Sequence, residues 1–368
     1  MRLTDTKWKL AVIGGVCGVL AVILALTGNP GNMAICVACF IRDIAGSLKL
    51  HTAGVVQYFR PEIVGFVCGS FLIALATREF RVTAGSSPAI RFLLGFIMMI
   101  GALVFLGCPL RMLIRMAAGD ANAYVALVGF VAGIGTGCLF LKKGFSLGRS
   151  YEAKPANGYI LPALLVIGLV VSVATTLFAS STEGPGSMRA PVLVALLVAL
   201  VFGALAQKSR MCFAGGIRDV FLMRDFSLLS ILGGMFVILL VFNIATGRFH
   251  FGFTGQPVAH AQHLWNFLGL YAVGFAAVLA GGCPLRQLIL AGQGSTDSGI
   301  TFLGLLVGAA FAHNFGLAGA AAKAATETEA AVAGGPGLNG KIALLCGIAV
   351  LFVIALTNLK KNKARDSG

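Results

Sequence analysis

Apolar residues fill long runs of this chain, and most charged residues lie in the stretches between them. Four such runs, 155–182, 190–207, 226–247 and 342–359, contain no Asp, Glu, Lys or Arg. Each run is long enough to cross about 30 Å of hydrocarbon as a helix. The pattern therefore predicts an all-α polytopic membrane protein.

The apolar runs predict about ten spanning helices. Lys7 and Lys9 precede the first run, as in a signal peptide, but no small-residue cleavage signal follows, so we expect this segment to stay in the membrane. The predicted spans are 10–27, 62–78, 92–107, 122–141, 159–179, 190–207, 226–246, 265–282, 299–316 and 342–358.

Composition and charge add an orientation to this picture. Hydrophobic residues make up 58% of the chain and charged residues only 11%, which is far from the composition of a soluble domain. If the connections alternate between two sides, the side with both termini holds roughly two thirds of the 28 Lys and Arg residues, an excess typical of cytoplasmic loops. We therefore expect both termini in the cytoplasm. The net charge of +15, including the basic segment 360–365, is then explained by loops and anionic lipid, without nucleic acid.

Two motifs occur twice, in the same order. "CVACFIRD" begins at Cys36 and "CFAGGIRD" at Cys212, and each is followed by "GCPLR", which begins at Gly107 and again at Gly282. Matching glycines extend the equivalence beyond the motifs. Chance is a poor explanation for two motifs in one order at one spacing, so we infer an internal duplication.

The duplication also predicts how the two copies lie in the membrane. Five predicted helices separate the start of one copy from the start of the next, so the copies cross the membrane in opposite directions. Such an inverted repeat places a substrate site near the midplane, between the halves. The predicted division is a first repeat with two re-entrant segments at 1–141, a connecting helix at 142–189, a second repeat at 190–316, and a loop, last helix and basic tail at 317–368.

The GCPLR motif predicts a broken helix. Proline suits the first position of a helix and disfavours helical geometry in the residue before it. We expect non-helical backbone at this depth to be buried in protein or to line a cavity. The predicted break, N-cap and first helical residue are Gly107, Cys108 and Pro109 in the first copy and Gly282, Cys283 and Pro284 in the second.

Each broken helix is a candidate anion site. The N-terminus of a half-helix offers unpaired N–H groups and the positive end of a dipole, and both favour an anion. Arg111 and Arg286 follow the cysteines on the same helical face and add a full positive charge. The alternative is a simple kink with an arginine that anchors the membrane boundary, and the presence of two related copies disfavours it.

The C-x5-R-D segments are also expected to be re-entrant, because charges interrupt their short apolar stretches. Six residues correspond to about 240° of rotation on a straight helix, so Cys36 and Arg42 lie on different faces. We therefore assign the arginine–aspartate pairs to structure rather than to substrate, because charges within a membrane need partners. These pairs are Arg42 with Asp43 and Arg218 with Asp219.

The nine cysteines separate into groups. Those inside ordinary apolar helices are interpreted as packing residues. Cys39 is interpreted as incidental, because Gly215 takes its place in the second copy. We expect no metal site and no cofactor. The remaining cysteines, one in each re-entrant segment, form a predicted line of thiols: Cys36, Cys108, Cys212 and Cys283.

The GCPLR pair, the C-x5-R-D pair and the duplicated layout resemble the YeeE/YedE family of sulfur-compound transporters, and "SRMCFAGGIRD" resembles its selenium-transport branch. The resemblance implies an hourglass-shaped protein of the bacterial inner membrane, in which cysteines at constrictions pass an anion along through S–H···S contacts. Cys36, Cys108 and Cys283 match the family's thiol positions directly, and Cys212 matches through the repeat. The resemblance also implies a small cytoplasmic sulfurtransferase-like partner.

The main hypothesis is a transporter, not an enzyme, that imports a small sulfur- or selenium-containing anion such as thiosulfate. One alternative is a membrane thiol enzyme, in which a cysteine of lowered pKa keeps the sulfur or selenium as a persulfide-like adduct. Another is a passive anion channel. Intact substrate inside proteoliposomes indicates transport, whereas a mass shift on Cys108 or Cys283 indicates the enzyme.

Overall fold

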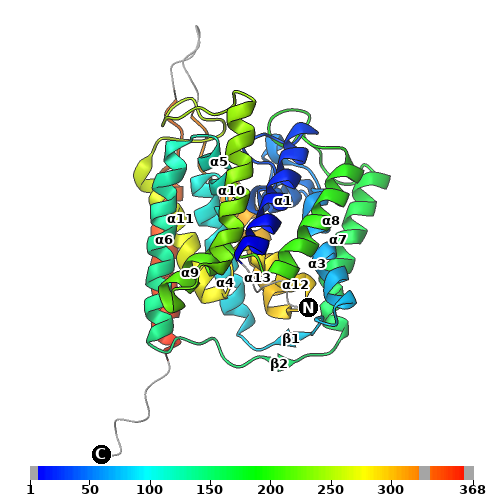
Figure 1. Ribbon diagram of the computed structural model, residues 1–368, viewed down its shortest axis with the longest axis vertical. Helices are drawn as coiled ribbons and strands as arrows, with labels where there is room; N and C mark the ends of the chain where they lie inside the picture. Colours follow the sequence, from blue (N-terminus) through cyan, green and yellow to red (C-terminus); the bar gives the residue numbers. More distant parts are fainter. Residues whose placement is uncertain (1–6, 323–331, 360–368) are drawn as a thin grey trace, which may run out of the picture.

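The computed structural model describes residues 7–322 and 332–359, which form a bundle of helices with almost no sheet (Figure 1). The predicted basic segment 360–365 lies outside the described residues. The long helices are α1 (Lys7–Leu26), α3 (Pro61–Ala76), α4 (Pro88–Phe105), α6 (Ala121–Lys142), α7 (Ala156–Ala174), α8 (Val192–Ser209), α10 (Ser227–Ala245), α11 (His263–Ala280), α13 (Thr296–Asn314) and α14 (Leu338–Thr357). The shorter elements are α2 (Val37–Ser47), α5 (Pro109–Ala117), α9 (Phe213–Met223), α12 (Pro284–Gly292), the 3-10 helix η1 (Gly54–Val56), β1 (Thr83–Ala84) and β2 (Tyr151–Glu152).

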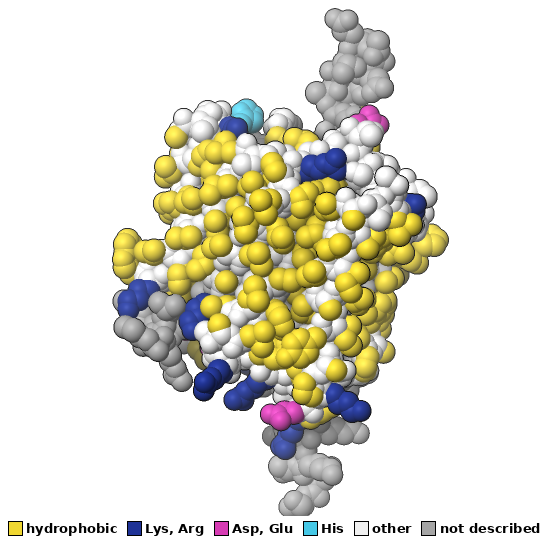
Figure 2. Space-filling view, turned by 90° about the vertical axis from the view of Figure 1, so that its right-hand side faces the viewer, with side chains coloured by type: hydrophobic (Ala, Val, Ile, Leu, Met, Phe, Trp, Pro, Cys, Tyr) yellow, Lys and Arg dark blue, Asp and Glu magenta, His cyan; other side chains and the backbone are white. Residues whose placement is uncertain are grey.

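The long helices have the length and composition of membrane spans. Within the described residues, nine helical segments are long and apolar enough to cross a membrane. The tenth predicted span, 299–316, is present as the helix α13, but polar residues at both of its ends make it less apolar than the others. Hydrophobic side chains cover the middle of the face in Figure 2, and Lys and Arg gather toward its two ends. The prediction of an all-α polytopic membrane protein is confirmed.

Contacts between the long helices occur in equivalent pairs. The helix α1 packs on α10 as α8 packs on α3, and α6 packs on α11 as α13 packs on α4. The helices α4 and α11 also pack on each other. If each helix is replaced by its counterpart in the other predicted copy, each of these contacts becomes another contact in the set. A twofold axis between the copies has this consequence. The inverted repeat stays a prediction, and these pairings support it.

Two equivalent glycines explain how closely the paired helices approach. A Cβ on Gly129 would collide with the carbonyl of Phe267, and a Cβ on Gly304 would collide with the carbonyl of Phe92. The absence of a side chain therefore lets α6 lie against α11, and α13 against α4, with their backbones in contact. These small-residue faces serve packing within the chain.

The connections at each end of the bundle contact one another. At the lower end of Figure 1, β1 pairs with β2 in antiparallel fashion, and the Ser86 hydroxyl donates to Asp297 at 2.7 Å. At the other end, the Asn314 amide donates to the carbonyl of Leu50 at 2.9 Å, and Gly252 N–H donates to the carbonyl of Gly119 at 3.1 Å. If successive helices cross the membrane in alternating directions, these same connections are expected on the same side. Which end faces the cytoplasm stays a prediction.

The predicted helix breaks are confirmed. The helix α4 ends at a left-handed residue, Leu106 (φ 65°), and Gly107 N–H closes the last turn on Ala102 at 2.7 Å. The helix α11 ends in the same way at Gly281 (φ 82°), and Gly282 N–H bonds to the carbonyl of Ala277 at 2.8 Å. In each copy a half-helix then begins at the proline of the motif.

Candidate functional site

Each of the four half-helices begins directly after a cysteine. The prediction of a cysteine N-cap is confirmed for α5 and α12. The same arrangement occurs at α2 and α9, where the cysteine is not followed by a proline. All four helices thus direct their N-terminal N–H groups and the positive ends of their dipoles toward a thiol. The capping cysteines of α2, α5, α9 and α12 are Cys36, Cys108, Cys212 and Cys283.

The first two thiols are in direct contact. Cys36 Sγ and Cys108 Sγ lie 3.7 Å apart, and the two residues are 0% and 1% exposed. Each residue opens its own helix, because its carbonyl accepts the first helical hydrogen bond. The N-termini of α2 and α5 therefore converge on one buried thiol pair, which the separation of 72 residues along the chain does not reveal.

The two thiols of the second copy also lie near each other, but within the described residues no hydrogen bond joins them. Cys212 and Cys283 are 6% and 1% exposed. The Cys212 thiol also accepts from the N–H of Gly215 at 3.1 Å. In both copies, therefore, the cysteine of C-x5-R-D meets the cysteine of GCPLR. Within the described chain, no hydrogen bond joins the first thiol pair to the second.

All three guanidinium nitrogens of Arg111 donate hydrogen bonds to other groups of the protein. Its Nε donates to the carbonyl of Asn32 at 3.1 Å, and its Nη2 donates to the Asn32 side chain at 3.3 Å and to the carbonyl of Val258 at 3.1 Å. Its Nη1 contacts the carbonyl of Leu106 and, at 3.4 Å, Cys39 Sγ. Every nitrogen of this 0%-exposed side chain thus has a protein partner. The sulfur of Cys39 is one of these partners, a contact that the sequence did not reveal.

Arg286, in the same motif position, is bonded very differently. Its Nη1 is buried without a hydrogen-bond partner, and the ion pairs of residues 7–322 and 332–359 do not include it. Arg210 and Arg218 lie close enough to repel its charge, and the thiol of Cys212 is also near. The second copy therefore presents an unneutralised cation beside its thiols.

The glycine of each motif makes room for the arginine. A Cβ on Gly107 would lie 2.6 Å from Cδ of Arg111, and a Cβ on Gly282 would lie 2.7 Å from Cγ of Arg286. Each arginine thus folds back over the residue that precedes the cysteine. This contact explains why glycine, cysteine and arginine occur together in the motif.

The first arginine–aspartate pair belongs to a larger buried ion network. Arg42 Nη2 and Arg60 Nε both lie 2.7 Å from the Asp43 carboxylate. Arg60 also donates to the carbonyls of Pro185 at 2.9 Å and Met188 at 3.1 Å. The network ties α2 to the start of α3 and to the segment before α8. Sequence reasoning missed Arg60, although a charge directly before Pro61 at a helix start was a usable signal.

The second pair is smaller and more exposed. Arg218 Nη2 lies 2.8 Å from the Asp219 carboxylate, with side-chain exposures of 32% and 11%. Within the described residues this carboxylate has no second arginine. The assignment of both pairs to structure stays a prediction, and the geometry of the first pair supports it more strongly.

Comparison with known families places this geometry in context. Residues 208–367, which include α9, α12 and the second GCPLR motif, match the family described as sulphur transport. No curated protein matches the chain. The resemblance to the YeeE/YedE family of sulfur-compound transporters is thereby confirmed over residues 208–367.

Proposed function

We propose that this protein, whose residues 208–367 match the sulphur transport family, imports a small sulfur- or selenium-containing anion, such as thiosulfate, along a path lined by its four capping thiols. The anion passes the Cys36–Cys108 pair and then the Cys212–Cys283 pair. The protein lies in a bacterial inner membrane with both termini in the cytoplasm. A small cytoplasmic sulfurtransferase-like protein receives the cargo.

The contact between Cys36 and Cys108 is the observation that carries this proposal. Two thiols 3.7 Å apart, each at the N-terminus of a half-helix, combine S–H donors with converging positive dipole ends. This combination favours a soft anion without requiring a fixed counter-ion. Several weak, similar sites in sequence let the anion both enter and leave, which a single tight site does not allow.

Arg286 provides the main fixed charge of the proposed path. Its guanidinium is not neutralised, whereas the guanidinium of Arg111 is satisfied by protein acceptors. In this proposal Arg286 attracts the anion toward the second thiol pair. Arg111 instead holds the backbone around the first pair in place.

Uptake of labelled anions tests the proposal most directly. Cells without their own carriers, and proteoliposomes with the purified chain, receive labelled thiosulfate, selenite, sulfate or sulfide. We expect thiosulfate or selenite to accumulate intact and sulfate to be excluded. Substrate sulfur or selenium trapped on the protein, without intact substrate inside, would instead support the thiol enzyme. Uptake that only follows the anion's own electrochemical gradient, without coupling to another ion, would support a channel.

Substitution of the thiols separates a relay from covalent chemistry. Cys108→Ser keeps a hydrogen-bond donor and should retain partial uptake, whereas Cys108→Ala should reduce uptake to near background. The same order is expected at Cys283. Cys346→Ala on the exposed face of α14 is the matched control and should transport like the wild type. Equal and complete loss in the Ser and Ala variants would contradict the relay.

Orientation needs a separate test. A single cysteine introduced at Lys143, after α6, should react with a membrane-impermeant reagent only when the cytoplasmic side is accessible. Labelling of this cysteine in intact cells from the periplasmic side would overturn the proposed orientation. Cross-linking from the same position identifies any soluble partner that docks on this face.

A further inference from the structure

The contact between Cys36 and Cys108 also places two oxidisable groups side by side. Both cysteines are free, and their sulfur atoms lie 3.7 Å apart. A disulfide bond is about 2.05 Å long, so the sulfur atoms need to approach by about 1.7 Å to form one. Cys36 caps α2 and Cys108 caps α5, so such a bond joins two separate half-helices at their N-termini.

The surroundings of this pair favour the reactive form of a thiol. Oxidants attack the thiolate, and the positive end of a helix dipole favours the thiolate over the thiol. Both half-helices direct this end toward the pair. Arg111 is close enough to act on the charge of Cys36, and its Nη1 lies 3.4 Å from the sulfur of Cys39. Burial opposes a lasting charge, so the thiolate is a transient reactant rather than the resting state.

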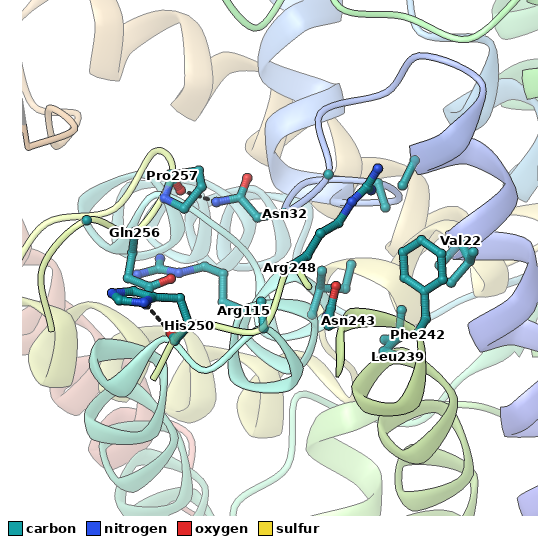
Figure 3. Close-up of a pocket in the computed structure, with 17 residues that line it drawn as sticks. Val22, Asn32, Arg115, Leu239, Phe242, Asn243, Arg248, His250, Gln256 and Pro257 are labelled. Carbon is teal, nitrogen blue, oxygen red and sulfur yellow. Dashed lines mark hydrogen bonds between the residues drawn. The ribbon is translucent and has the colours of Figure 1, made fainter. Parts of the chain in front are cut away.

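A cavity extends from the surface toward the pair. Its volume is about 440 Å³, and it is enclosed by α1, α5, α10 and the segment 248–257 (Figure 3). Its lining runs from the exposed residues Arg248 and His250 to the buried residue Ala34, which stands two positions before Cys36. The cavity therefore brings a small uncharged oxidant such as hydrogen peroxide close to the pair. A protein oxidant cannot touch these buried thiols.

We propose that peroxide converts Cys36 and Cys108 into a reversible disulfide that closes the first thiol pair to the anion. One thiolate attacks the peroxide, so that an S–O bond forms, the O–O bond breaks and hydroxide leaves. The second thiolate attacks this sulfur, so that the S–S bond forms, the S–O bond breaks and a second hydroxide leaves. The two protons from the thiols convert both hydroxides into water. Two electrons thus pass from the sulfur atoms to the peroxide.

The effect of this disulfide on uptake rests on the proposed function. The S–H groups of Cys36 and Cys108 are the donors offered to the anion at this point, and a disulfide has no S–H group. The bond also fixes α2 to α5 where the two helices begin. Because the thiols are buried, the pair stays reduced until a small oxidant reaches it. Uptake therefore stops in the presence of peroxide and resumes after reduction.

The second thiol pair provides a control within the same chain. The sulfur of Cys212 accepts from the N–H of Gly215 at 3.1 Å. In the part of the chain that the structure describes, no hydrogen bond joins this sulfur to that of Cys283. We therefore expect the first pair to form a disulfide before the second.

Peptide mapping of the purified full-length protein tests the site. The protein is treated with peroxide, its remaining thiols are blocked, and the chain is cleaved after Lys and Arg. The fragment 92–111 then holds Cys108 as its one cysteine, and the fragment 10–42 holds Cys36. We expect these fragments to be joined, with a mass about 2 Da below their sum, because two hydrogen atoms are lost. Dithiothreitol should release them.

The same map contains the outcomes that overturn the site. Fragment masses locate the linked cysteine within 10–42, and the link should persist in Cys39→Ser. A link of Cys108 to Cys39 contradicts the proposal, as does equally fast linking of Cys283. The absence of a link at a peroxide dose that oxidises the exposed Cys346 also contradicts it.

Uptake of labelled thiosulfate into proteoliposomes, measured after the peroxide is removed, tests the consequence. Wild-type uptake should fall in proportion to the linked fraction and return with dithiothreitol. Cys346→Ala should respond like the wild type, whereas Cys108→Ser should keep its own starting uptake, because Cys36 then has no partner. Undiminished uptake by fully linked protein, or equal loss in Cys108→Ser, overturns the closure. A link that forms in protein without any uptake supports the redox site and contradicts the proposed transport instead.

Discussion

Arg111 and Arg286 occupy the same position of the same five-residue motif, yet their surroundings differ. In both copies a glycine accepts the folded arginine, a cysteine caps the half-helix and a proline begins it. Arg111 then donates to the backbone and side chain of Asn32, whereas Nη1 of Arg286 is left without a partner. Lys208 stands four residues before Cys212, as Asn32 stands before Cys36, and its side chain cannot accept. The motif therefore determines the local backbone, and residues outside it determine what the arginine does.

The largest expected difference between the copies concerns their aspartates. Asp43→Asn leaves Arg42 and Arg60 buried without a counter-charge and should destabilise the protein by about 3–5 kcal/mol. Asp219→Asn breaks a partly exposed pair and should cost no more than about 1 kcal/mol. Thermal melting in detergent and the yield of monodisperse protein measure both. Similar losses in the two variants would contradict the distinction between a buried network and a peripheral pair.

The arginines should separate stability from transport. Arg111→Gln leaves backbone carbonyls without donors and should lower stability by about 2–3 kcal/mol. Arg286→Gln removes a charge without breaking a bond to the protein, so it should keep the melting temperature and reduce anion uptake about tenfold. Parallel melting and uptake measurements give the comparison. Unchanged uptake in Arg286→Gln would remove the support for an anion contact there.

The glycines should show the same asymmetry at smaller scale. An added methyl group at either position meets the arginine, and overpacking of this kind costs about 1–3 kcal/mol. Arg111 is fixed by its hydrogen bonds, so Gly107→Ala should lie near the upper end of this range. Arg286 can move, so Gly282→Ala should lie near the lower end. Melting curves of the two variants decide, and the reverse order would contradict this account.

The smallest expected effect concerns the start of α10. Asp225 accepts from the N–H of Ser227 at 2.9 Å and from its hydroxyl at 2.6 Å, and these bonds lower the pKa of Asp225 below its usual value. The stabilisation is present above the usual carboxyl pKa and is lost as the pH falls through the lowered pKa. Asp225→Asn should therefore melt slightly earlier than the wild type at neutral pH, with a difference that closes on acidification. A difference independent of pH would exclude the carboxylate as its cause.

The hydrophobic pattern and the motifs predicted the parts of this fold that depend on local sequence. The apolar runs located the spanning helices because the solvent around them is apolar, and the proline of GCPLR located the half-helices α5 and α12. Both effects act within a few residues. These predictions therefore did not depend on which distant segments pack together.

Other parts of the site depend on contacts between distant segments. The pairing of Cys36 with Cys108, and the occupation of Arg111 by Val258, arise from how helices and loops pack. Nothing in GCPLR distinguishes a bonded arginine from an unpaired one. The duplication suggested that the two arginines act alike, and the structure differs because the loops around the two copies are not alike.

The buried contact of Cys36 and Cys108 has an electrical consequence. The voltage across a membrane falls where neither water nor salt ions are present, so on the proposed path it would fall across this buried contact. Each elementary charge that crosses 100 mV exchanges about 2.3 kcal/mol with the field. An anion that moves toward a negative interior works against this field, and a dianion does twice the work. On the proposed transport path, the thiol contact would therefore serve as the insulator that lets a cell keep its resting voltage while the anion accumulates.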